Sequence, residues 1–192
     1  AKDVVNGEYY LCPTFNYTLP PIIRHRCVMH SIGVPEDLDK YLNFSTPKYI
    51  SHRANTIGPN PETENCPEVI EKVHKDFECD VEIDVWVTSK GIELGHDSPK
   101  YKVDLAFLKR PWLWCHAKNE QALQMLLEEK IHCFYHGRDD HTITSRGIVW
   151  TYPSKPLVRN GVAVKPEGFY TYSEIRKAAY VCSDYADPKM WC

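Results

Sequence analysis

The chain has 192 residues, and its 43% hydrophobic and 26% charged content is typical of a folded globular protein, which excludes a disordered one. Its 23 Lys and Arg against 26 Asp and Glu leave a net charge of −3, so we expect no general nucleic-acid binding, which needs a basic surface. No apolar run approaches the ~20 residues of a membrane span, and the first residues contain no apolar signal-peptide core, so we predict neither segment.

Residues 1–46 differ in pattern from the rest and form a predicted N-terminal extension of α+β type. A strand is predicted near 8–12, a strand pair over 22–32, and a short helix over 35–42, where Pro and acidic residues occupy the first turn. A second domain is predicted over 47–192.

From Lys48 onward, short apolar strands alternate with helices or loops, which favours a parallel α/β sheet. Strands are predicted over 48–52, 80–87, 92–95, 112–117, 131–136, 147–152, 161–165 and 179–183. Helices are predicted over 66–77, 119–129 and 172–179, the second because its apolar residues have helical spacing.

Eight cysteines are present, an even number that permits a disulfide framework. However, Cys115, Cys133 and Cys182 lie inside apolar strands, where a free thiol behaves as a small buried hydrophobe. We therefore favour reduced thiols in an intracellular, cytoplasmic protein.

The strand from Asp80 to Val87 carries the most informative pattern. Alternation places its valines and Ile83 on one face and Glu82 and Asp84 on the other. Two close carboxylates repel and raise each other's pKa unless a cation lies between them, and a hard divalent cation with oxygen ligands fits this pair. The alternative is an edge strand with a solvated acidic face.

Histidines end two further predicted strands. His52 and Arg53 end the strand at 48–52, where an α/β barrel would place a catalytic group and where Arg offers a fork for a phosphate. His96 follows the strand at 92–95, and its separation from Glu82 in the sequence suits a strand, a tight turn and a return strand. Ordinary surface positions at strand ends remain the alternative for both histidines.

The strand at 112–117 brings a third pair of polar residues. Trp112, Trp114, His116 and Lys118 share one parity, so a strand parallel to the acidic one would aim His116 and Lys118 at Glu82 and Asp84. A buried Lys needs an anionic partner. The alternative is that Lys118 has already left the strand.

Together these motifs resemble, in order and over residues 48–188, the glycerophosphodiester phosphodiesterases, which belong to the phosphatidylinositol phospholipase C-like superfamily. The motifs are His-Arg at 52–53, Pro-Glu-Thr-Glu-Asn at 61–65, Asp-Val-Glu-Ile-Asp-Val at 80–85, Leu-Gly-His-Asp at 94–97, the strand ending in Lys118, and Val-Cys-Ser-Asp-Tyr-Ala-Asp-Pro at 181–188.

The resemblance implies a TIM-type (β/α) barrel with its site at the carboxyl ends of the strands. It implies the following roles: His52 and His96 as the general acid–base pair, Arg53 and Lys118 as phosphate contacts, and Glu82, Asp84 and Glu64 as metal ligands or their close neighbours. Where the family has a third carboxylate ligand, this chain has His116, and Ala54 replaces the usual Gly after His-Arg.

The resemblance implies one divalent cation, Mg²⁺ or Ca²⁺. His116 instead favours Mn²⁺ or another transition metal, because imidazole is a poorer ligand for the harder ions. The implied activity is hydrolysis of glycerophosphodiester-like or phospholipid headgroup substrates. A catalytically inactive fold that serves as a structural subunit of a larger assembly is the alternative.

Residues 1–46 resemble the C-terminal end of a sugar-phosphate nucleotidyltransferase, through Asn6 to Tyr17 and Ser31 to Leu42. An unrelated extension is the alternative. Residues 47–192 are few for a barrel, which usually needs roughly 250 residues. We therefore predict a reduced or irregular barrel, in which loops replace some crossover helices.

Overall fold

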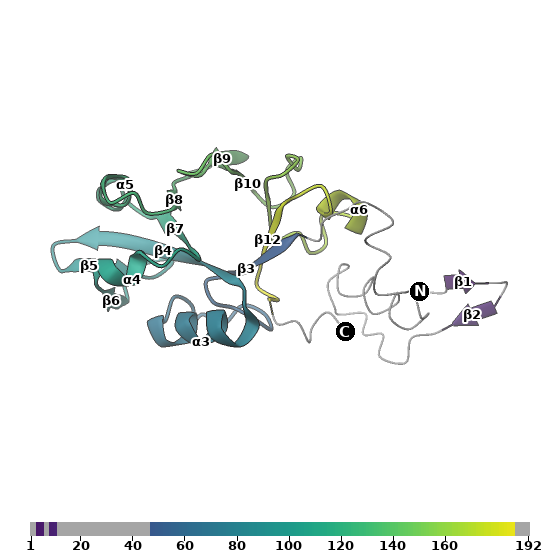
Figure 1. Ribbon diagram of the computed structural model, residues 1–192, viewed down its shortest axis with the longest axis horizontal. Helices are drawn as coiled ribbons and strands as arrows, with labels where there is room; N and C mark the ends of the chain where they lie inside the picture. The colour runs from purple at the N-terminus through teal and green to yellow at the C-terminus, as the bar shows by residue number, and fades with distance from the viewer. Residues whose placement is uncertain (1–2, 6–7, 11–46, 187–192) are drawn as a thin grey trace.

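The computed structural model describes residues 3–5, 8–10 and 47–186 (Figure 1). The predicted strand near 8–12 is present as β2 (Glu8–Tyr10), which pairs antiparallel with β1 (Asp3–Val5). The predicted strand pair over 22–32 and the helix over 35–42 lie outside the described residues. The domain boundary at residue 46 and the nucleotidyltransferase-like extension stay predictions.

Within residues 47–186 the strands form one mixed, ten-stranded sheet. Its parallel part has the spatial order β8-β7-β4-β3-β12-β11-β10. These strands are β3 (Lys48–His52), β4 (Asp80–Thr88), β7 (Leu113–Ala117), β8 (Cys133–Phe134), β10 (Val149–Thr151), β11 (Val162–Val164) and β12 (Tyr180–Ser183). Three antiparallel strands extend it: β5 (Gly91–Leu94) on the second half of β4, β6 (Tyr101–Val103) on β5, and β9 (His141–Ile143) on β10.

Every strand predicted from Lys48 onward is present, with ends that differ by a few residues at most. Strands β6 and β9 and the short helix α4 (Leu105–Leu108) were not predicted, because each is too short to show a periodic pattern.

Two helices of more than two turns follow β3 and β7. Helix α3 (Pro67–Phe77) has Pro in its first turn and is followed by Glu78, whose φ of 51° is the left-handed conformation common after a helix. Helix α5 (Glu120–Glu128) begins after Asn119, whose side chain accepts a hydrogen bond from the Ala122 N–H. The predicted helix at 172–179 is shorter, α6 (Tyr172–Ile175).

The predicted reduced TIM-type barrel is wrong. A (β/α) barrel needs a crossover helix after each parallel strand and a sheet that closes on itself. Between β4 and β7 the chain instead forms two antiparallel strands and the four-residue α4, and between β8 and β10 it forms β9. The result is a curled, mixed half-barrel with few helices, in which the hydrogen-bonded path ends at β6 and β9 (Figure 1).

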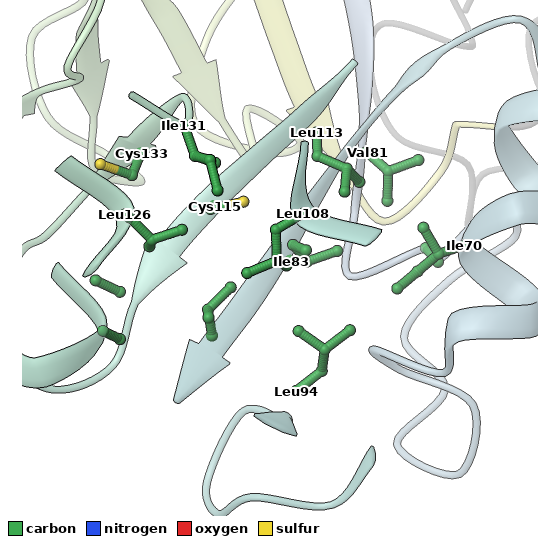
Figure 2. Packing of buried hydrophobic residues seen from close by; sticks show 14 of the residues in the cluster. Ile70, Val81, Ile83, Leu94, Leu108, Leu113, Cys115, Leu126, Ile131 and Cys133 are labelled. Atoms are coloured by element: carbon green, nitrogen blue, oxygen red, sulfur yellow. The ribbon is translucent and has the colours of Figure 1, made fainter. Parts of the chain in front are cut away.

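One face of the sheet packs against the helices and forms the larger core. Val81, Ile83 and Val85 of β4 are fully buried there, as the alternation in the sequence predicted, and Ile70 of α3 and Leu126 of α5 cover them (Figure 2). At about 25 cal/mol per Å² of buried apolar surface, such side chains provide most of the stabilisation of the fold.

The other, inner face carries a second core built around three large aromatic side chains. It consists of Ile50, Trp114, Phe134, Trp150, Val162, Val164 and Cys182, which come from six strands. Phe134 on β8 stacks on Trp150 on β10 at 4.2 Å between ring centroids, although these two strands do not pair with each other. The sheet therefore curls around this aromatic cluster, which fills the interior below the strand ends.

No helix in the described part of the chain is long and apolar enough to cross a membrane. The five cysteines of that part are free thiols, and burial raises the pKa of Cys115, Cys133 and Cys182.

Candidate metal centre

Two buried carboxylates lie on the inner face of β4. Glu82 is 2% exposed and Asp84 is fully buried, and β4 is paired along both of its edges, with β3 and β5 on one side and β7 on the other. The edge-strand alternative for this acidic face is therefore wrong. A buried carboxylate pair needs positive partners, since the transfer of an unpaired charge out of water is costly.

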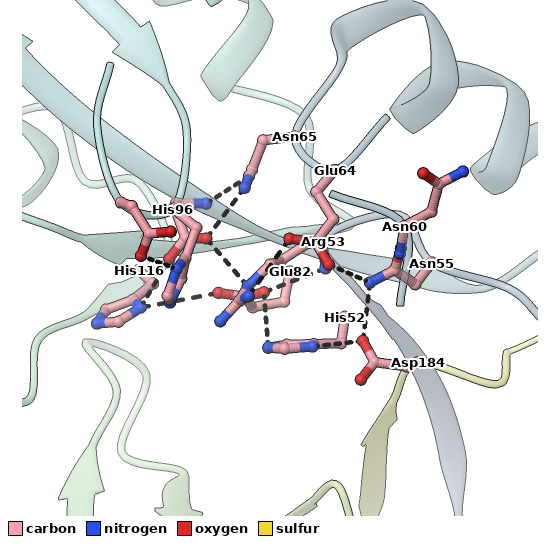
Figure 3. Close-up of polar contacts among 12 residues, drawn as sticks. His52, Arg53, Asn55, Asn60, Glu64, Asn65, Glu82, His96, His116 and Asp184 are labelled. Carbon is pink, nitrogen blue, oxygen red and sulfur yellow. Dashed lines mark hydrogen bonds and ion pairs between the residues drawn. The ribbon is translucent and has the colours of Figure 1, made fainter. Parts of the chain in front are cut away.

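His116 completes a group of three potential ligands (Figure 3). Strand β7 runs parallel to β4 and aligns His116 with Asp84, which puts both side chains on the same face. His116 Nδ1 lies 3.1 Å from Asp84 Oδ1 and 3.9 Å from Glu82 Oε1. Ligand atoms of Glu82, Asp84 and His116 all lie within 4.8 Å of one another, a spacing at which one ion could be held between them.

The pKa values of the two carboxyls diverge. Burial raises the pKa of Glu82 well above its ordinary value, and the neighbouring charge of Asp84 raises it further. Burial also acts to raise the pKa of Asp84, but the hydrogen bond with His116 and the charges of Lys118 and Arg53 hold it below its ordinary value. Glu82 is thus the carboxylate that lacks sufficient positive charge around it.

The His116 ring is held in place by two parallel rings. Its centroid lies 4.9 Å from Phe134 and 4.7 Å from His136, with 6° between the planes in each case. Burial lowers the pKa of His116 despite the opposing hydrogen bond to Asp84, so the neutral ring that a metal requires is favoured.

Arg53 and Lys118 contact the same group. Lys118 lies one residue beyond the end of β7, as the alternative stated, but its side chain still reaches the acidic pair, as predicted. Arg53 Nε lies 3.3 Å from Asp84 Oδ2, and Lys118 Nζ lies 3.4 Å from Asp84 Oδ1. Both side chains are partly exposed, so their cationic ends border the surface as well as the carboxylates.

His52 faces Glu82 from β3. Its Nε2 lies 4.0 Å from Glu82 Oε2, and its Nδ1 lies 2.7 Å from Asp184 Oδ1. Burial acts to raise the pKa of Asp184, but bonds from His52, Lys165 and Asn55 bring it below its ordinary value. Because an ionised carboxylate only accepts, the proton of a neutral His52 ring lies on Nδ1, and Nε2 keeps its lone pair.

Glu64, an expected metal ligand, lies outside the three-residue group. It accepts hydrogen bonds from Arg53 Nη1 at 3.4 Å and from Asn55 Nδ2 at 2.9 Å. Its position supports Arg53 and does not support direct ligation. The adjacent Asn65 bonds Asp84 twice, since its Oδ1 accepts from the Asp84 N–H at 2.8 Å and its Nδ2 donates to Oδ2 at 3.0 Å.

His96 lies at the end of β5, in the turn that follows Gly95. Its Nδ1 lies 2.7 Å from Asp97 Oδ1, and among the described residues no hydrogen bond or ion pair joins it to the three ligands. The Gly95 N–H donates to the Asp84 carbonyl at 3.1 Å, so the turn itself is attached to the site strand. The acid–base role of His96 stays a prediction.

Four residues of this polar network were not predicted to have a role: Asn55, Asn65, Lys165 and Asp184. Asp184 was part of a recognised motif, but its contact with His52 spans 132 positions and depends on the parallel pairing of β12 with β3. Local patterns do not encode such a pairing. Asn65 adopts the left-handed conformation, with φ of 62°, which Asn adopts more readily than most residues. Its residue type was therefore a weak sequence signal for this conformation.

Three site residues lie two positions beyond a residue of the inner core. His52 follows Ile50, His116 follows Trp114, and Asp184 follows Cys182. The period of two along a strand therefore puts the polar group directly above the aromatic cluster, at the carboxyl end of each strand.

A scan against protein-family models and searches of curated proteins and of solved structures found no match to this chain. The resemblance to phosphodiesterases stays a prediction. The geometry that these residues adopt is independent of it.

Proposed function

We propose that this protein is a metal-dependent hydrolase of phosphodiesters, with glycerophosphodiester-like or phospholipid headgroup compounds as its substrates. The observation that carries the proposal is the convergence of two elements on Glu82. On one side, three potential ligands lie within 4.8 Å of one another, and on the other, His52 is oriented by Asp184.

Glu82, Asp84 and His116 would hold the ion. Two carboxylates and one imidazole suit Mn²⁺ or another transition metal better than an all-oxygen site does, although Mg²⁺ also takes carboxylates. The bound ion would supply Lewis-acid chemistry, since it polarises a phosphoryl oxygen and offsets negative charge.

Arg53 and Lys118 would bind the phosphate. Each contacts Asp84 while part of its side chain reaches the surface, so a phosphate beside the ion would meet both cations. Fixed cations stabilise the charge that develops on a phosphoryl group during its transfer.

His52 would accept the proton of the attacking hydroxyl at Nε2. The Asp184 carboxylate fixes the ring and stabilises the imidazolium that forms. The attacking group is water or a substrate hydroxyl. His96 is the expected donor to the leaving alcohol, from the turn held by the bond between Gly95 and Asp84.

The experiment is hydrolysis of a glycerophosphodiester with Mn²⁺, Mg²⁺ or Ca²⁺, and again in excess chelator. We expect activity that chelation abolishes and that falls by about 1,000-fold in His52→Ala, since the loss of a general base costs 10²–10⁴-fold. His74→Ala is the matched control, because His74 stacks on Trp112 and bonds the Cys79 carbonyl away from the site. Activity that persists in chelator would contradict the proposal.

Calorimetric titration with Mn²⁺ distinguishes the alternative of an inactive fold. Stoichiometric binding that disappears in the double variant Glu82→Ala/Asp84→Ala supports a metal centre. If no metal binds and the protein is recovered in a stable larger assembly, the structural role is correct and the hydrolase is not.

A further inference from the structure

We propose that Asn55 is a positioning residue that joins the acid–base histidine to the phosphate-binding arginine. This inference rests on the proposed function for the roles of His52 and Arg53. The link itself consists of contacts between described side chains, and these can be tested without catalysis.

The Asn55 side chain lies between two carboxylates that serve different halves of the site (Figure 3). Its Nδ2 donates to Asp184 Oδ1 at 2.8 Å and to Glu64 Oε1 at 2.9 Å. Asp184 accepts from His52, and Glu64 accepts from Arg53. One amide group therefore holds the partner of the histidine and the partner of the arginine at a fixed separation.

Asn55 is itself fixed on all sides. It is only 3% exposed, and its Oδ1 accepts from the Asn60 N–H at 3.0 Å. Its own N–H donates to the His52 carbonyl at 2.9 Å, and its carbonyl accepts from Ser51 Oγ at 2.7 Å. All of its polar groups are thus bonded, so the amide has one orientation.

The backbone between the two halves needs such a fixed point. Arg53 and Ala54 have φ values of 55° and 66°, so two successive residues with side chains adopt the left-handed conformation. Each costs of order 1 kcal/mol and persists only where the surroundings impose it. This turn aims the side chains at 52, 53 and 55 at one space, and the bonds of Asn55 close it.

The chemistry of the position requires an amide. The two N–H bonds of a planar NH₂ group match two carboxylates, and the amide carries no charge of its own. Asp at this position would place a third carboxylate against Glu64 and Asp184, where like charges repel. Ala would leave each carboxylate without one of its donors.

The first test compares Asn55→Ala with Asn119→Ala. Both asparagines make three side-chain hydrogen bonds to described residues, but Asn119 caps α5 and bonds β4 through Val87, outside the polar site. With Mn²⁺ and bis(4-nitrophenyl) phosphate, we expect Asn55→Ala to lower kcat by roughly 10–100-fold and to raise KM severalfold, because small misplacements of catalytic groups cost up to about 100-fold. Asn119→Ala should change neither.

The second test needs no activity. In ¹H–¹⁵N NMR spectra we expect the Nδ1–H of His52 to give a protected signal that exchanges with water much faster in Asn55→Ala. We also expect inorganic phosphate to bind this variant severalfold more weakly. If the wild-type protein hydrolyses nothing, the proposed function fails, while these two measurements still decide the role of Asn55.

The inference is overturned if Asn55→Ala keeps the wild-type His52 signal or the wild-type phosphate affinity, because a link between two halves must affect both. If Asn55→Ala does not fold, Asn55→Ser replaces it in the same measurements. Its hydroxyl has one donor and cannot serve both carboxylates.

Discussion

The two faces of β4 show opposite uses of the same strand. Val81, Ile83 and Val85 point toward the helices and are fully buried among apolar side chains. Glu82 and Asp84, which alternate with them, are buried just as deeply on the other face but are surrounded by imidazole, guanidinium and ammonium groups.

The two faces contribute to stability in opposite ways. The apolar face gains free energy from burial, whereas the acidic face loses free energy on desolvation and recovers it only through its partners. We therefore expect substitutions on the first face to reduce stability and substitutions on the second to reduce ligand binding.

The largest expected effect is on the acidic face. Asp84→Asn should weaken Mn²⁺ binding by about 1,000-fold or more, since even the partners of metal ligands are worth 10–100-fold. Asp80→Asn is the matched control, because Asp80 lies on the same face of β4 but accepts from Trp114 Nε1 at the far end. Calorimetric titration measures both, and equal affinities in the two variants would contradict the assignment of Asp84.

The next effect is on the apolar face. Ile83→Ala should lower the free energy of unfolding by about 3 kcal/mol, because the loss of a fully buried aliphatic side chain leaves a cavity. The folded variant should bind Mn²⁺ with the wild-type affinity. Chemical denaturation gives the stability, and Ile143→Ala, at a side chain that is 63% exposed, should change it by less than about 0.5 kcal/mol.

The next effect is pH-dependent and concerns the contribution of His132 to stability. Burial lowers the pKa of His132 to about 4, and neither ring nitrogen has a hydrogen-bond partner among the described residues. The unfolded chain, with an ordinary His pKa near 6.5, takes up the proton first, so stability should fall as the pH drops from about 6.5 to 4. His132→Phe should remove about 2 kcal/mol of this loss.

Denaturation at pH 7 and at pH 4.5 measures that difference. Ile143→Ala, which changes an exposed side chain and no titratable group, should retain the wild-type pH dependence. The same slope in His132→Phe as in the wild type would show that this ring does not contribute.

The smallest effect concerns a helix end on the apolar face. Asn119→Ala removes the N-terminal cap of α5 and should cost about 1 kcal/mol, with no change in metal affinity. Thermal unfolding measures it. A loss of Mn²⁺ binding in this variant would mean that the two faces of β4 are not separable.

The strands and the acidic face of β4 could be predicted because both rest on a local period of two. The fold class could not, because the barrel prediction assumed that the segment between β4 and β7 crosses over as a helix, whereas it folds back as β5 and β6. The direction of His116 was predicted correctly because it needs only the pairing of β7 with β4, and Lys118 reaches Asp84 from one residue beyond β7. Asp184 and Asn55 were missed because their contacts depend on how the whole sheet curls.

The aromatic cluster of the inner core also limits the directions from which a molecule could reach the site. Trp114, Phe134 and Trp150 fill the space beneath the three potential ligands, so a substrate of the proposed site would approach and leave from the carboxyl ends of the strands. Only the phosphodiester group of such a substrate would have to fit between the potential ligands. The remainder of the substrate would extend away from the protein, so its length would not be restricted by the interior.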